Sequence, residues 1–382
     1  MIQNRPLLTR IKPYLTVFDG PLLFILALLA GSGLLIMYSS AFDFSGRFVD
    51  HLRNYIIALI VMWVIANISP QTLMRVAVPL YLLGVLLLIG VALGGEVRKG
   101  ARRWLNLGFT TVQPSEIMKI AMPLMLAWYF HKYEAVLKFK DFIVATILLV
   151  VPVALIAKQP DLGTAILVLS AGLFVLFFAG LSWKLIIPVI LTGLIGITVM
   201  VAMEEKLCQP NVDWKILHDY QKNRVCTQLN PMHDPLGKGF HSIQSAIAIG
   251  SGGLTGKGLM QGTQTHLEFV PERTTDFILA VYAEEFGLLG TIWLVILYLA
   301  LVFRGLMIAG NAPTTFTRLL AGSITLIFFT YAFVNMSMVA GMLPVVGVPL
   351  PFMSYGGTAL LTLGLGCGIL MSIQRHRTLM SH

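Results

Sequence analysis

The hydrophobic residues of this chain fall into long apolar runs that are separated by shorter polar segments. Most of the runs approach the roughly 17–25 residues that a helix needs to cross about 30 Å of hydrocarbon. Ten transmembrane helices are expected, over 20–40, 52–68, 76–94, 117–131, 142–157, 162–182, 185–203, 276–303, 316–341 and 356–373. The pattern predicts an all-α polytopic membrane protein with a single integral membrane domain over residues 1–382.

An even number of spans places both termini on the same side of the membrane. If that side is the cytoplasm, the inside segments carry more Lys and Arg than the short outside loops. The positive-inside rule favours this orientation, although a cation cluster at 98–103 lies outside. The first run, 20–40, lacks a small-residue cleavage site and is predicted to be a span rather than a cleaved signal. We therefore predict that both termini are cytoplasmic.

The longest polar segment, 204–275, then becomes one long external loop. It contains two of the three cysteines, Cys208 and Cys226. In an oxidising compartment this pair could form a disulfide, which would stabilise the folded protein by about 3 kcal/mol in the chain-entropy model. Two unrelated free thiols are an equally weighted alternative. Residues 240–250 have the pattern of a short amphipathic helix on the membrane interface.

The composition excludes a soluble protein. Hydrophobic residues make up 57% of the chain, charged residues 12%, and the mean hydropathy is +0.81, whereas about 25% of the residues of a soluble domain are charged. The net charge of +9 is spread over both faces, which indicates membrane lipid as a partner and no nucleic acid. No cofactor is evident, because His, Cys and acidic residues do not cluster at metal-ligand spacing. A divalent cation bridging substrate phosphates remains compatible with the sequence.

Asp276 is the strongest candidate for chemistry. It stands at the start of an apolar run, where a charged side chain is costly and is read as functional by default. On a continuous helix, one face would carry small residues together with this carboxylate. The residues of that face are Asp276, Ala280, Ala283, Gly287 and Gly290. We expect Asp276 to point into the bundle or a cavity; the alternative is that Thr274 or Thr275 caps the helix and the Asp complements its dipole.

Cations and carboxylates also gather in the loop before the fourth span. Arg102 and Arg103 lie beside Trp104 in a group of four cations, which suits a phosphate or pyrophosphate at the membrane surface. Glu116 and Lys119 are three residues apart, so they can pair on one helical face. The alternative is an ordinary loop that contacts anionic lipids.

Two further segments interrupt helices at membrane depth. Lys158 and Asp161 flank Pro160 in a break that is tolerated only where the backbone faces protein or a wet cavity; a plain turn with a capping Asp is slightly favoured. The segment 341–357 carries three prolines and four glycines yet stays apolar. It predicts a re-entrant or interfacial loop that shapes a cavity.

Several motifs in this order resemble the signatures of the SEDS family (shape, elongation, division and sporulation). The resemblance covers nearly the whole chain, and the form before Asp276 is more similar to the elongation branch than to the division branch. The motifs are Gly100–Trp104, Gln113–Glu116, Gln159–Gly163, Pro271–Phe277, Ala283–Gly287, and Leu343–Pro351 with Ser354–Gly357. Thr274 departs from the family pattern, in which His is more frequent.

The resemblance implies a peptidoglycan glycosyltransferase that polymerises lipid II at the outer face of the bacterial cytoplasmic (inner) membrane, for cell elongation and rod shape. It implies Asp276 as the catalytic carboxylate and a class B penicillin-binding transpeptidase as a partner. The substrate-binding residues are then expected among Arg102, Arg103, Glu116, Lys119, Lys158, Asp161, Glu268 and Arg273.

Two other classes of protein compete with an enzyme. A lipid II flippase would also have many helices with buried charges, and a scaffold would only recruit the transpeptidase. The sequence contains no inverted repeat, and its polar groups cluster at the predicted outside ends of the helices. This distribution favours chemistry at one face of the membrane.

Overall fold

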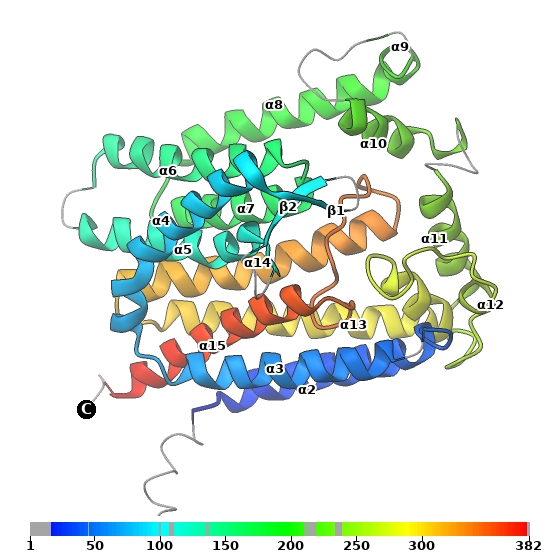
Figure 1. Cartoon of the computed structure of the whole chain (residues 1–382), viewed down its shortest axis with the longest axis horizontal. Coiled ribbons are helices and arrows are strands. Elements are labelled where there is room, and N and C mark those ends of the chain that lie inside the picture. The colour runs from blue at the N-terminus through cyan, green and yellow to red at the C-terminus, as the bar shows by residue number, and fades with distance from the viewer. Residues whose placement is uncertain are drawn as a thin grey trace, which may run out of the picture.

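The computed structural model describes residues 17–44, 46–98, 101–106, 111–134, 137–209, 212, 219–233 and 239–379. Within these residues, long helices run roughly along one direction and form a bundle (Figure 1). They are α2 (Gly20–Ser40), α3 (Arg47–Ala66), α4 (Pro70–Gly94), α5 (Pro114–Lys132), α6 (Phe139–Lys158), α7 (Leu162–Phe178), α8 (Trp183–Ala202), α13 (Ile278–Gly310), α14 (Thr315–Val339) and α15 (Gly357–Leu379). Each expected apolar run falls on one of these helices.

Eight of the long helices are long and apolar enough to cross a membrane. The other two are α7, which is apolar but has only 17 residues, and α5, which carries Glu116 and Lys119 in its first two turns. The chain is therefore a multi-pass membrane protein, while the count of ten spans stays a prediction. The start of α2 and the end of α15 lie at the same end of the bundle (Figure 1), as an even number of crossings requires.

The core surrounds α14, which packs against α5, α7, α13 and α15. The pair α3 and α15 approaches closely because glycines face the α3 backbone. A Cβ added at Gly364 or Gly368 would lie 2.7 Å from the carbonyl oxygen of Ala58 or Met62 respectively. Small residues at such a contact are typical of membrane helix packing. By contrast, α8 contributes no buried residue to the bundle.

A small antiparallel sheet corrects the all-α prediction. It consists of β1 (Glu96–Arg98), β2 (Ala101–Asn106) and β3 (Thr111–Val112), in the order β1-β2-β3. These strands are too short to appear as apolar runs, and β-branched and aromatic residues favour them locally. The sheet places Arg98, Arg102 and Arg103 on an extended backbone rather than in an ordinary loop.

The start and the middle of α13 correct the predicted face of small residues. Asp276 lies in a turn before the helix, whose first residue is Ile278. At Gly287 the backbone is non-helical, with φ 64° and ψ −162°. A Cβ there would lie 2.3 Å from the backbone nitrogen of Gly256, so the close approach of another loop requires glycine. The helix is therefore kinked, and the small residues do not form one continuous stripe.

The described parts of the segment 204–275 gather at the end of the bundle opposite the start of α2 (Figure 1). Their elements are α9 (Glu204–Leu207), α10 (Asp219–Leu229), η2 (Pro231–His233), α11 (Phe240–Ser251) and α12 (Thr263–His266). The short amphipathic piece expected at 240–250 corresponds to α11, which packs against α13 and α14. Its place on the membrane interface stays a prediction. Cys208 and Cys226 form a disulfide with a Cα–Cα distance of 5.6 Å, and Cys367 is free and buried.

A buried carboxylate fastens part of this segment to α13. Glu284 is fully buried and accepts hydrogen bonds from Lys257 Nζ at 2.6 Å and from the backbone N–H groups of Gln264 and Thr265 at 2.9 and 3.2 Å. A buried charge is stable only when it is paired and hydrogen-bonded in this way. The bonds explain why a charged residue is compatible with the interior at this position.

Candidate functional site

A cavity of about 420 Å³ lies at the end of the bundle where α5, α7, α13 and α15 begin. Its walls come from strand β2, the starts of α5, α7 and α15, the turn before α13, and the loop 347–356. The lining includes Arg103, Trp104, Gln113, Glu116, Lys119, Asp161, Glu272, Thr275, Asp276, Gly347 and Tyr355. Helix N-termini carry partial positive charge, and Arg103 and Lys119 add two cations to a lining that also carries four carboxylates.

Asp276 is half-buried at the wall of the cavity. Its carboxylate lies against Gly347, since a Cβ on that glycine would be 3.6 Å from Asp276 Oδ2. Asn335 Nδ2 donates to the carbonyl oxygens of Asp276 at 2.9 Å and of Val348 at 2.7 Å. One side chain of α14 therefore fixes both the turn that carries the carboxylate and the loop opposite it.

Two more hydrogen bonds join this loop to the same turn. Ser354 Oγ donates to the carbonyl oxygen of Thr275 at 2.6 Å, and Tyr355 N donates to that of Thr274 at 2.8 Å. Neither Thr274 nor Thr275 caps α13: its N-cap is Phe277, without a side-chain cap bond. The apolar loop predicted to shape a cavity does so, and it positions the Asp276 turn.

The base of the cavity contains a buried ion pair. Lys119, whose side chain is 3% exposed, donates to Glu116 Oε1 at 2.5 Å and to the Tyr331 hydroxyl at 2.7 Å. Thr362 donates to the other Glu116 oxygen at 3.1 Å. The predicted pairing of Glu116 with Lys119 is confirmed, and it lies inside the cavity rather than on a lipid-facing surface.

Arg103 and Asp161 meet across the cavity mouth. Arg103 donates to the carbonyl oxygen of Pro160 and lies 4.0 Å from Asp161 Oδ1. Asp161 also accepts from Gln113 Nε2 at 2.9 Å and, as the N-cap of α7, from the N–H of Thr164 at 3.3 Å. The Asp is thus both the capping residue and part of the cavity wall.

The remaining sequence-predicted site residues lie elsewhere. Arg102 and Lys158 are exposed and do not line the cavity, and neither does the exposed Glu268. Successive side chains of a strand point to opposite faces, which explains why Arg103 reaches the cavity and its neighbour Arg102 does not. Lys158 is the last residue of α6, two residues before Pro160.

Arg273 does not line the cavity, and its contacts lie beside α2. It is buried, pairs with Asp43, and donates from Nε to the carbonyl oxygen of Ser40 at 3.0 Å. Partial burial raises the pKa of Asp43, but the hydrogen bond and the charge of Arg273 outweigh it and hold that pKa below its usual value. The arginine therefore fastens the turn before α13 to the end of α2.

Sequence reasoning did not select Gln113, Glu272 or Tyr355 as site residues. Gln113 and Tyr355 belong to motifs that were already recognised, so those motifs could have supplied them. Glu272 lies four residues before Asp276 in a turn that no periodicity reveals. Among the described residues, no group of three or more His, Cys, Asp or Glu could hold a metal ion.

Comparisons with known proteins agree with this architecture. Over residues 21–379 the chain matches the model of the cell cycle protein family named for FtsW, RodA and SpoVE. It is 49% identical, over 360 residues and 94% of each chain, to the peptidoglycan glycosyltransferase MrdB of Escherichia coli K12.

Two solved structures share the fold. A chain of a peptidoglycan synthase complex superposes with a TM-score of 0.76 at 31% identity, covering 94% of this chain and 98% of that one. The rod shape determining protein RodA of Thermus thermophilus gives a TM-score of 0.69 at 27% identity, covering 94% and 97%. The resemblance seen in the motifs is confirmed, and the chain belongs to the FtsW, RodA and SpoVE family of cell cycle proteins.

Proposed function

We propose that this protein is a peptidoglycan glycosyltransferase that polymerises lipid II into glycan strands for cell elongation. The observation that carries the proposal is the cavity of about 420 Å³ that Asp276 lines together with Arg103 and Lys119. A carboxylate beside cations suits a reaction between a sugar hydroxyl and a sugar pyrophosphate. The name of the relative at 49% identity supports the same activity.

In the proposed reaction, Asp276 is the general base. It removes the proton of the 4-hydroxyl of the acceptor sugar, and the oxygen forms a bond to the anomeric carbon of the donor. The bond between that carbon and the pyrophosphate oxygen breaks, with inversion, and the undecaprenyl pyrophosphate leaves with the electron pair. General-base assistance of this kind contributes about 10²–10⁴-fold to a rate.

The leaving pyrophosphate needs positive charge that is already in place. Arg103 is the best-placed donor, because its Nε is buried and has no hydrogen-bond partner in the described part of the chain. Lys119 already bonds Glu116 and Tyr331, so it contributes charge from the base of the cavity. Asp161, which is held by Gln113, positions Arg103 at the cavity mouth, and Glu116 keeps Lys119 in position.

The proposal includes a location and a partner. The cavity faces the outer side of the bacterial cytoplasmic membrane, both termini are cytoplasmic, and all ten long helices cross the bilayer. A class B penicillin-binding transpeptidase accompanies the enzyme, which the likeness to a chain of a peptidoglycan synthase complex supports. A divalent cation on the substrate pyrophosphate would show itself as activity lost in chelator and restored by Mg²⁺.

Asp276→Asn is the decisive variant. Purified protein with its partner and labelled lipid II should lose polymerisation by about 10²-fold or more, because the amide cannot accept the proton. Glu268→Gln is the matched control: it neutralises an exposed carboxylate of the same segment that does not line the cavity. Its rate should stay within about twofold of wild type, since surface substitutions change little.

The same assay separates the three functional classes. Polymer from the wild type but not from Asp276→Asn supports the enzyme. A wild type that moves lipid II across vesicles without forming polymer would identify a carrier. If neither reaction occurs but the transpeptidase becomes active on binding, the protein is a scaffold. Full polymerisation by Asp276→Asn would remove the carboxylate from the mechanism.

A further inference from the structure

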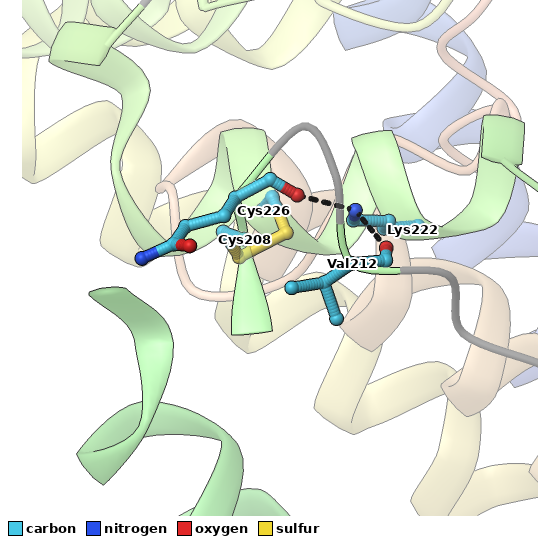
Figure 2. The surroundings of a disulfide bond; sticks show 5 residues. Cys208, Val212, Lys222 and Cys226 are labelled. Carbon is cyan, nitrogen blue, oxygen red and sulfur yellow. Dashed lines mark hydrogen bonds between the residues drawn. A yellow bond between two sulfur atoms is a disulfide. The ribbon is translucent and has the colours of Figure 1, made fainter. Parts of the chain in front are cut away.

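Helix α10 connects two parts of the chain that are far apart in sequence. Its residues Lys222 and Cys226 are four positions apart, so they share one face of the helix. Lys222 donates to the carbonyl oxygens of Gln209 (2.7 Å) and Val212, and Cys226 is bonded to Cys208 (Figure 2). This face therefore holds the segment that follows α8 and α9.

The other face of α10 holds the loop before α15. Arg224 and Gln228 are also four positions apart, and both are half-buried. Arg224 Nη1 donates to the carbonyl oxygen of Val345 at 2.9 Å, and Gln228 Nε2 donates to that of Gly341. Both bonds reach backbone atoms of a loop that has no regular secondary structure of its own.

The residues that follow Val345 form the cavity wall against Asp276. Gly347 and Val348 line the cavity, and Gly347 is the glycine that faces Asp276 Oδ2. Asn335 holds this loop from α14 through Val348. Arg224 holds it from the outside, three residues earlier in the chain. Irregular backbone has several conformations to lose, so the bonds from Asn335 and Arg224 help to hold this part of the wall in one conformation.

We propose that Arg224 is a positioning residue for the transfer reaction and that the Cys208–Cys226 disulfide keeps the helix that presents it in place. The disulfide joins α10 to the end of α8 and α9, and α8 contributes no buried residue of its own. Without the covalent bond, the two hydrogen bonds of Lys222 remain to hold this face of α10. The inference rests on the proposed function, because it assumes that the wall beside Asp276 belongs to the reaction site.

The test compares polymerisation of labelled lipid II before and after reduction of the folded, purified protein with its partner. Reduced wild type should slow by about twofold to thirtyfold, the range for changes that act on a site through another element. Arg224→Ala should slow by a similar factor, and Arg224→Lys, which keeps a cationic donor, should recover part of the rate. Melting temperatures check that each variant is folded.

Two cysteine variants identify the source of the response. The pair Cys208→Ser with Cys226→Ser should be slow and insensitive to reductant, which also controls for cysteines of the partner. Cys367→Ser should respond like wild type, because this thiol is free and buried in α15. The most diagnostic measurement combines the Arg224→Ala variant with reductant. Reduction should change the rate of this variant by less than about twofold, because the effects of groups that act as one unit are not additive.

Three results would overturn the inference. They are a fully reduced wild type with an unchanged rate, Arg224→Ala at the wild-type rate, and an Arg224→Ala enzyme that reductant slows by the same factor as wild type. Should Arg224→Ala fail to fold, the reduction of folded wild type decides alone. Asp276→Asn is measured in the same series. If it polymerises, the proposed function fails; if it is inactive while reduction has no effect, only the role of α10 is wrong.

Discussion

At the scale of residues, the site is defined by which polar side chains reach one cavity. Arg102 and Arg103 are identical in type and adjacent in sequence, so charge counting could not separate them. The two residues are distinguished because successive side chains of a β-strand point to opposite faces. The pattern of apolar residues did not predict this strand. Arg273 shows the same limit: the motif marks it as a candidate for substrate binding, but its position beside Asp43, away from the cavity, could not be read from the motif.

The buried pair at the base of the cavity gives a prediction at this scale. Glu116→Ala and Lys119→Ala should each lower the polymerisation rate by roughly tenfold to more than a hundredfold, because each loses a charge-assisted contact worth about 1.5–3 kcal/mol. The double variant should lose little more than either single one, since both break the same pair. Steady-state rates for the four enzymes measure the coupling.

A second pair, at the far end of α5, provides the control. His131 and Glu134 are also three residues apart and lie 3.2 Å from each other, but Glu134 follows the end of the helix and is exposed. Their alanine variants should polymerise within about twofold of wild type, because exposed pairs contribute little. Additive losses at 116 and 119 would show that these two residues act separately in the site.

At the scale of elements, the apolar runs were sufficient to locate the long helices, because burial in lipid or protein requires continuous apolar surface. They could not reveal the kink of α13. That kink depends on Gly256 approaching Gly287 from another loop. A contact between residues that are distant in sequence does not produce a periodic pattern of apolar residues. The turn with Asp276 was misplaced for the same reason: bonds from α14 and the loop before α15 determine it.

The kink can be tested by adding one methyl group. Gly287→Ala should lower the free energy of unfolding by about 1–3 kcal/mol, because the residue has φ 64° and its Cβ would meet the Gly256 backbone. Gly193→Ala in α8 is the control, since a Cβ there meets nothing within 4 Å. Thermal unfolding in detergent should show a large decrease for the first variant only. Equal melting temperatures would mean that the kink relaxes without cost.

At the scale of the molecule, sidedness determines whether the cavity can meet a lipid-linked sugar outside the cell. The described structure places the cavity at the end of the bundle away from the start of α2 and the end of α15 (Figure 1). Charge bias predicts that the end with the start of α2 and the end of α15 is cytoplasmic. Chemical labelling of cysteines from outside the cell measures this orientation.

The two cysteines of the disulfide are the residues to be labelled. In intact cells, membrane-impermeant maleimide should not modify Cys208 or Cys226 until a reductant is added, after which both should react from outside. Cys367, which is buried in α15, should stay protected throughout. Mass spectrometry of the purified protein reads all three sites. Labelling of the reduced pair only after the cells are opened would reverse the orientation and move the cavity to the cytoplasmic side.

The kink in α13 also limits where the chain can change its length. Four backbone hydrogen bonds join residues 253–258 to residues 284–289, two on each side of Gly287. Inserting or deleting a single residue between Gly253 and Gly258 would put donors and acceptors out of register. Tags, fluorescent domains and loop grafts should therefore fail in this short stretch, even though it lies in the longest polar segment of the chain.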